Sequence, residues 1–127
     1  MRRISMRVGL IVVLLWSSLA LAQIRVDVQL PLPVIVVTGE LRVGLVPNVV
    51  VVEQVREPQG IVVVYRSSQP YNTFVYHDRD LRDRGWTRVK YQAKGGHYRA
   101  EYRRGRTKAK LEVQDRKGRV EVRIREG

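Results

Sequence analysis

Hydrophobic and polar residues alternate one by one through the last part of the chain. Four such segments span about 86–93, 97–103, 106–114 and 119–125. Alternation with a period of two is typical of a β-strand that buries one face. The breaks between segments contain glycine, which supplies the positive φ of tight hairpin turns, at Gly95-Gly96, Arg104-Gly105 and 115–118. The pattern predicts an antiparallel meander of four strands.

The expected turns also predict which residues face each other. A two-residue loop at each of the first two turns would place Tyr98 opposite Ala93 and also opposite Leu111. A four-residue loop at the third turn would place Leu111 opposite Val122. All three hairpins then keep apolar side chains on one side of the sheet, an arrangement that a slip of one residue would destroy.

A helical pattern precedes this meander, at about 69–84. Its apolar residues recur at helical spacing, at Tyr71, Phe74, Val75 and Leu81. Ser68 can cap the N-terminus, Pro70 suits the first turn, and Gly85 suits the position that follows the helix. A strand at 73–77 is the competing interpretation, since β-branched and aromatic residues cluster there. We expect the helix, packed on the apolar face of the meander.

Valine and proline are frequent in 23–60, where the pattern assigns elements less directly. Residues 24–30 alternate as a short strand, and two apolar runs within 34–52 are typical of strands covered on both faces. The peptide REPQG at 56–60 is typical of a hinge. The apolar run that follows at 61–65 is typical of a buried strand. The predicted fold class is therefore α+β: one helix packed on a four-stranded antiparallel β-meander within 61–127, with extra N-terminal strands of uncertain placement.

The first 22 residues have the three parts of a secretory signal peptide. Arg2, Arg3 and Arg7 form a basic start, an apolar run follows at 8–16, and SSLALA ends in the small-x-small pattern that signal peptidase cleaves. The apolar run is short for a membrane span, and an uncleaved anchor is the competing interpretation. We predict cleavage before Gln23 and a periplasmic or extracellular protein.

Net charge and the absence of cysteine exclude some classes of function and favour others. The chain has 24 Lys and Arg against 12 Asp and Glu, a net charge of +12, so a partner is expected to be anionic. It contains no cysteine, which excludes disulfides, thiolate zinc sites and cysteine nucleophiles.

The predicted register gathers cations on the outer face of the meander, away from the helix. One cross-strand row contains Arg99, Lys110 and Arg123 with no acid between them, and such neighbours repel because strands lie about 4.8 Å apart. An anion with several oxygens would relieve this repulsion and accept charge-assisted hydrogen bonds. The candidate anion-binding residues are Arg99, Lys110, Arg123, Arg88, Arg103, Arg106 and Lys108. The alternative is an ordinary solvated surface of long charged side chains that binds nothing in particular.

Specific nucleic-acid binding is not predicted. The basic face lacks aromatic residues on which bases could stack, because Tyr91, Tyr98 and Tyr102 alternate in phase with the apolar residues and are expected to point into the core. Outside the cytoplasm such a face would meet anionic lipid head groups or acidic polysaccharides, and we predict a non-catalytic envelope domain that binds them weakly. A second hypothesis is a protein–protein interaction module that adds the apolar strands of 34–52 to the sheet of another envelope protein.

Catalysis is the least supported class. The candidate acid–base or metal-ligating residues are His77, Asp78, Asp80 and His97, and the chain has no HExxH, GxSxG or phosphate-loop motif. Asp80 already has Arg84 as a partner four residues on, and His97 is adjacent to a turn. We predict neither a metal nor a cofactor, and keep a small hydrolase or metal-dependent enzyme only as an alternative.

The peptide YHDRDLRDRGW resembles a pattern in small exported bacterial proteins of unknown function. In that pattern an aromatic pair, a leucine and a terminal Gly-Trp close a helix before a β-meander. The matching positions are Tyr76, Leu81, Gly85 and Trp86, with His77 in place of the second aromatic residue. The resemblance covers about 60–125 and implies a helix-on-sheet fold with no activity.

Overall fold

The computed structural model describes residues 33–127, which form one compact unit. The predicted signal peptide and the strand predicted at 24–30 lie outside the described residues. The described elements, in chain order, are β2 (Val34–Val36), β3 (Arg42–Gly44), β4 (Val51–Glu57), β5 (Gly60–Arg66), α1 (Pro70–Asp83), β6 (Thr87–Lys94), β7 (His97–Arg104), β8 (Thr107–Asp115) and β9 (Arg119–Glu126).

The helix lies where its apolar spacing predicted it. Proline occupies its first turn, and Gly85 follows it with a φ of +96°, a left-handed conformation that ends the helix at little cost. The predicted cap at Ser68 is wrong, because Gln69 takes the N-cap position and makes no side-chain capping hydrogen bond.

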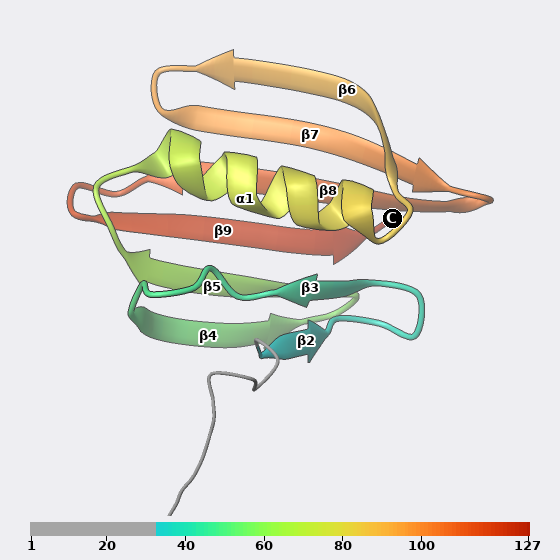
Figure 1. Cartoon of the computed structure of the whole chain (residues 1–127), viewed down its shortest axis with the longest axis horizontal. Coiled ribbons are helices and arrows are strands. Elements are labelled where there is room, and N and C mark those ends of the chain that lie inside the picture. The colour runs from blue at the N-terminus through green and yellow to red at the C-terminus, as the bar shows by residue number, and fades with distance from the viewer. Residues whose placement is uncertain (1–32) are drawn as a thin grey trace, which may run out of the picture. The chain divides into compact units, whose positions relative to one another are not determined.

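Six strands form one antiparallel sheet in the order β4-β5-β9-β8-β7-β6. After the β4–β5 hairpin the chain crosses the sheet through α1 and enters β6 at the opposite edge (Figure 1). The meander from β6 to β9 then returns across the sheet until β9 lies beside β5. This last pairing matches apolar residues of the two strands, with Ile61 opposite Ile124 and Val63 opposite Val122.

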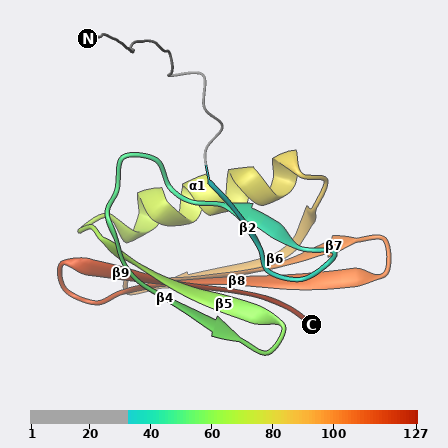
Figure 2. The same cartoon turned by 90° about the horizontal axis from the view of Figure 1, so that it is seen from below.

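A second layer covers one face of this sheet. It consists of α1 and, beside the helix, the small antiparallel pair β2–β3 (Figure 2). Phe74 and Leu81 of the helix are buried in the same core as Ile35 and Val43 of the small pair. The opposite face of the large sheet carries the charged residues of β7, β8 and β9, and we call it the outer face.

Arginine side chains fasten the second layer to the sheet. Arg56 of β4 donates hydrogen bonds to the main-chain oxygens of Val36 and Val37, at 2.9 and 3.0 Å. After the C-terminus of the helix, the guanidinium of Arg104 at the end of β7 lies 4.6 Å from the centre of the Trp86 ring. Planar, always charged guanidinium groups suit both contacts.

The predicted fold class is wrong. Residues 33–127 are mostly β, with eight strands divided between a sheet of two and an antiparallel sheet of six, and the one helix among them does not cover an isolated four-stranded meander. The hinge predicted at 56–60 is the turn of the β4–β5 hairpin, where Gln59 has a φ of +61°. The sequence did not predict that β5 would join the meander. A continuous apolar run such as 61–65 has no alternation to show which face is buried, and nothing in it indicates which strands lie beside it.

The tight approach of β5 to β9 gives the first testable prediction. A Cβ atom at Gly60 would lie 2.8 Å from Cβ of Arg125 and 2.9 Å from the main-chain oxygen of Ile124, whereas one at Gly39 would meet nothing within 4 Å. Gly60→Ala should therefore lower the free energy of unfolding by about 1–3 kcal/mol, as overpacking does. Urea denaturation is the measurement, and Gly39→Ala is the matched control. Equal losses in the two variants would contradict this account of the β5–β9 contact.

Candidate functional site

The strand register differs from the prediction by two residues in the last two hairpins. Tyr98 lies opposite Val113 rather than Leu111, and Leu111 lies opposite Ile124 rather than Val122. The second turn is Gly105-Arg106, one position later than predicted. A shift of two preserves which face each side chain takes, so the apolar side remains intact while the cross-strand neighbours change.

This shift changes the cationic row on which the predicted site was centred. Glu112 lies between Arg99 and Arg123, at the position where Lys110 was expected. Lys110 instead lies between Glu101 and Arg125. The uninterrupted row of three cations does not exist, and each of these rows includes a carboxylate.

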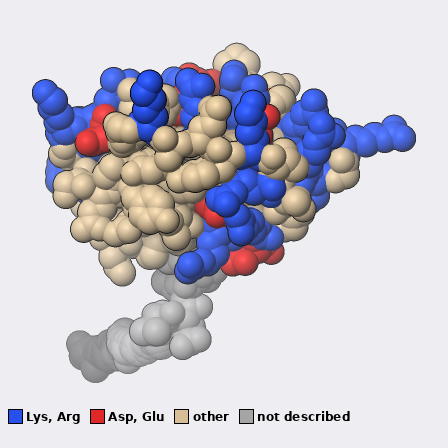
Figure 3. Space-filling view, turned by 90° about the horizontal axis from the view of Figure 1, so that it is seen from above, with Lys and Arg blue, Asp and Glu red and all other residues tan. Residues whose placement is uncertain are grey.

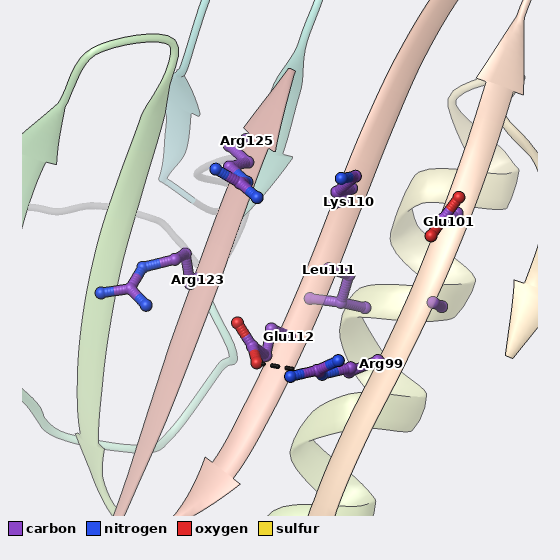
Figure 4. A pocket seen from close by; sticks show the side chains of 8 residues that line it. Arg99, Glu101, Lys110, Leu111, Glu112, Arg123 and Arg125 are labelled. Carbon is purple, nitrogen blue, oxygen red and sulfur yellow. Dashed lines mark hydrogen bonds and ion pairs between the residues drawn. The ribbon is translucent and has the colours of Figure 1, made fainter. Parts of the chain in front are cut away.

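The same side chains nevertheless line one depression on the outer face. Its charged lining is Arg99, Glu101, Lys110, Glu112, Arg123 and Arg125. Figure 4 shows them on neighbouring strands around Leu111, with the helix on the far side of the sheet. Four cations and two carboxylates leave the lining with a net positive charge, so the three residues at the centre of the prediction share one site with a different arrangement.

Glu112 is the most heavily engaged acid of this site. Its Oε2 accepts hydrogen bonds from Nε2 of His97, at 2.7 Å, and from Nε of Arg99, at 3.2 Å. Partial burial alone would raise the pKa of Glu112, but the hydrogen bond and charge of His97, then those of Arg99, outweigh burial and lower that pKa. The carboxylate is therefore ionised and neutralises part of the cationic surface around it.

The cations of the depression fall into two groups. Arg123 pairs with Glu57 of β4 at 3.2 Å and is 3.9 Å from Glu121, so acids compensate it as they do Arg99. Within residues 33–127, Lys110 and Arg125 form no ion pair. They are directly opposite each other on β8 and β9. These two side chains are the part of the site best able to receive an anion.

The remaining predicted residues divide between the two faces. Arg103 and Lys108 lie opposite each other on the outer face, and Arg106 is in the turn that joins their strands. Arg88 lies on the helix side, contrary to the prediction, because a β-bulge between Arg88 and Lys90 reverses its direction. Its Nη1 is 3.4 Å from Oδ1 of Asp78, and its guanidinium lies 4.8 Å from the Tyr91 ring centre.

Arg125 and Glu57 are among the participants of the site that the sequence did not predict. Arg125 is two residues from Arg123 on β9 and therefore lies on the same face, so the alternation of the strand could have identified it. Glu57 carried no such signal, because its contact with Arg123 depends on β4, β5 and β9 lying side by side.

The histidine and aspartate candidates are engaged in contacts within the fold. His77 is buried, and its Nε2 is 3.0 Å from the hydroxyl of Tyr65, which also accepts a hydrogen bond from the main-chain nitrogen of Val46. Asp80 accepts hydrogen bonds from the main-chain nitrogen of Gly44 and from Nε of Arg84. Within residues 33–127 no cluster of His, Asp and Glu side chains has the arrangement of a metal site.

Comparison with known proteins gave no assignment: no family model, no curated protein and no solved structure matches the chain. In the described part, the single helix is too short and too polar to cross a bilayer.

The buried histidine gives a prediction of pH dependence. Burial lowers the pKa of His77 to about 3, from an ordinary value of 6.5. Between these values the unfolded chain binds a proton that the folded chain excludes. The contribution of neutral His77 to the free energy of unfolding is therefore present above about pH 6.5 and is lost as the pH falls toward 3. From pH 7 to pH 5 the free energy of unfolding should fall by about 2 kcal/mol more in the native protein than in His77→Leu. Urea denaturation at the two pH values measures this difference, and equal slopes would refute it.

Proposed function

We propose that this protein is an exported, non-catalytic envelope protein that binds anionic groups on the outer face of its large sheet. The signal-peptide pattern of the first 22 residues and the net charge of +12 support this function. The observation that carries the proposal is the opposed pair Lys110 and Arg125 in the depression, neither of which forms an ion pair within residues 33–127.

Directly opposed residues on neighbouring strands bring like charges close enough to repel. A phosphate or carboxylate between Lys110 and Arg125 would replace this repulsion by two charge-assisted interactions. The planar guanidinium of Arg125 can donate two hydrogen bonds to one such group, while the ammonium of Lys110 contributes a mobile charge. Phosphate in lipid head groups and carboxylate in acidic polysaccharides share this chemistry.

The acids of the site limit how tightly an anion is held. Glu112 compensates Arg99, and Glu101 lies opposite Lys110 on the next strand. Binding is therefore weak and depends on several contacts along a polymer or membrane surface, and it decreases as salt screens the charges.

The segment 34–52, through which an interaction module would dock, exposes fewer apolar side chains than the sequence suggested. Ile35, Val37 and Val43 lie in the core, so they are not available to a partner. The exposed apolar side chains of this segment are Val34, Val36 and Val50. Docking through them would not depend on salt, which distinguishes it from the proposed function.

Replacing the opposed pair should weaken anion binding. We expect Lys110→Gln with Arg125→Gln to reduce the affinity for phosphatidylglycerol vesicles by about thirtyfold, since each basic residue near an anionic surface contributes about 1 kcal/mol. Vesicle co-sedimentation measures the affinity, with phosphatidylcholine vesicles as the neutral reference. Binding to soluble polygalacturonate, followed in parallel, distinguishes a lipid from a polysaccharide source.

The matched control removes the same charge elsewhere. Arg42→Gln with Arg79→Gln changes exposed cations of β3 and α1, away from the outer face, and should retain most of the affinity. If the two double variants bind equally, only net charge matters and the site is refuted. If the native protein binds neither probe, the outer face is an ordinary solvated surface.

Removing the central acid should have the opposite effect. Glu112→Gln takes a negative charge from between Arg99 and Arg123 and leaves both guanidinium groups less compensated. We expect anion affinity to rise severalfold, with a steeper dependence on salt because more cations contribute. The same vesicle assay over a salt series tests this, and a loss of affinity would contradict the charge arrangement described here.

A further inference from the structure

The large sheet has two free edges within the described part of the chain, β4 and β6. On β6 the regular pairing runs from Lys90 to Lys94, between a bulge and the Gly95-Gly96 turn. On β4 it runs from Glu53 to Glu57, again between an irregularity and a turn. The two edges therefore present regular stretches of equal length, each with main-chain groups that lack a neighbouring strand.

These edges carry opposite charges at the same spacing. Lys90 and Lys94 lie on the outer face, since Lys90 is opposite Glu101 of β7. Glu53 and Glu57 also lie on the outer face, where Glu57 contacts Arg123. Both pairs are four residues apart, and β6 contains no acid. Lysines on an edge oppose pairing of that edge with itself, but they favour pairing with an acidic edge.

The strand directions permit such a contact between copies. All neighbours in the six-stranded sheet are antiparallel, so β4 and β6 run in opposite directions. A second copy displaced sideways would therefore place its β4 antiparallel to β6, with both outer faces on the same side. We propose that β6 pairs with β4 of a second copy of this chain, with Lys90 opposite Glu57 and Lys94 opposite Glu53.

The helix side of both edges carries exposed apolar side chains. On β6, Tyr91 is 41% exposed and its ring packs against Phe74 of the helix, and uncharged surface gathers on this side of the molecule between Lys and Arg side chains (Figure 3). Beside β4, the strand β2 exposes Val34 by 47% and Val36 by 48%, and Arg56 of β4 bonds to the main-chain oxygen of Val36. Edge pairing would bring these apolar groups toward each other and remove part of their surface from water.

The contact joins two different surfaces, so it is heterologous. A dimer would keep β4 of one copy and β6 of the other free, so association would continue beyond a dimer. The assembly would present the outer faces of successive copies side by side. It does not depend on anion binding, because the proposed edge contacts do not include Lys110 or Arg125.

A charge-exchange experiment on the full chain tests the register. Sedimentation velocity of the native protein, at up to about 1 mM, should show a mass that rises with concentration. Lys94→Glu alone and Glu53→Lys alone should each weaken association by about tenfold, because like charges then face each other. An equimolar mixture of the two variants should restore association, since every β6–β4 junction between unlike chains again joins opposite charges.

Lys117→Glu, in the β8–β9 turn, is the matched control and should associate as the native chain does. Hydrogen exchange should show added protection at 53–57 and 90–94 in the associated sample. A native protein that stays monomeric at every concentration would overturn the proposal. A closed dimer, or variants whose mixture does not recover, would overturn it as well.

Discussion

The large sheet is continuous because β5 pairs with β9 along its whole length, from Gly60 opposite Arg125 to Arg66 opposite Arg119. This pairing joins a hairpin from the first half of the described chain to a meander from the second half, and it makes one six-stranded sheet of them. Ile61, Val63 and Tyr65 of β5 then lie in the same core as the apolar residues of β9. Without this contact β4–β5 would be an isolated hairpin, which is marginally stable in water.

The same pairing determines the charge pattern of the outer face. It brings β4 close enough to β9 for Glu57 to reach Arg123, while Glu112 compensates Arg99 from β8. Within the depression, Lys110 and Arg125 are an opposed pair of cations that form no ion pair among residues 33–127. The candidate site is thus a consequence of how the sheet is assembled, more than of the number of arginines in the sequence.

The sequence predicted the local features of this fold well. Alternation located the strands of the meander and the face of their side chains, except at the β6 bulge where Arg88 turns to the helix side, and apolar spacing located α1. These features depend on periods of two and 3.6 residues within one segment. The register of the hairpins was beyond such reasoning, because Arg104-Gly105 and Gly105-Arg106 are both acceptable two-residue turns and differ by two residues in pairing. The position of β4 and β5 was also beyond it, since their partners lie far away in sequence.

The order of the elements along the chain also affects when the protein can fold. β9 is the final element, yet it occupies an interior position in the sheet between β5 and β8. Until β9 has been synthesised, neither neighbour can complete its hydrogen bonding and the hydrophobic layer stays open. The large sheet therefore cannot form before β9 is present, and long-range pairing of this kind is slow. During this delay the apolar side chains of β5 and β8 stay exposed to water, where they can associate with those of other unfinished chains.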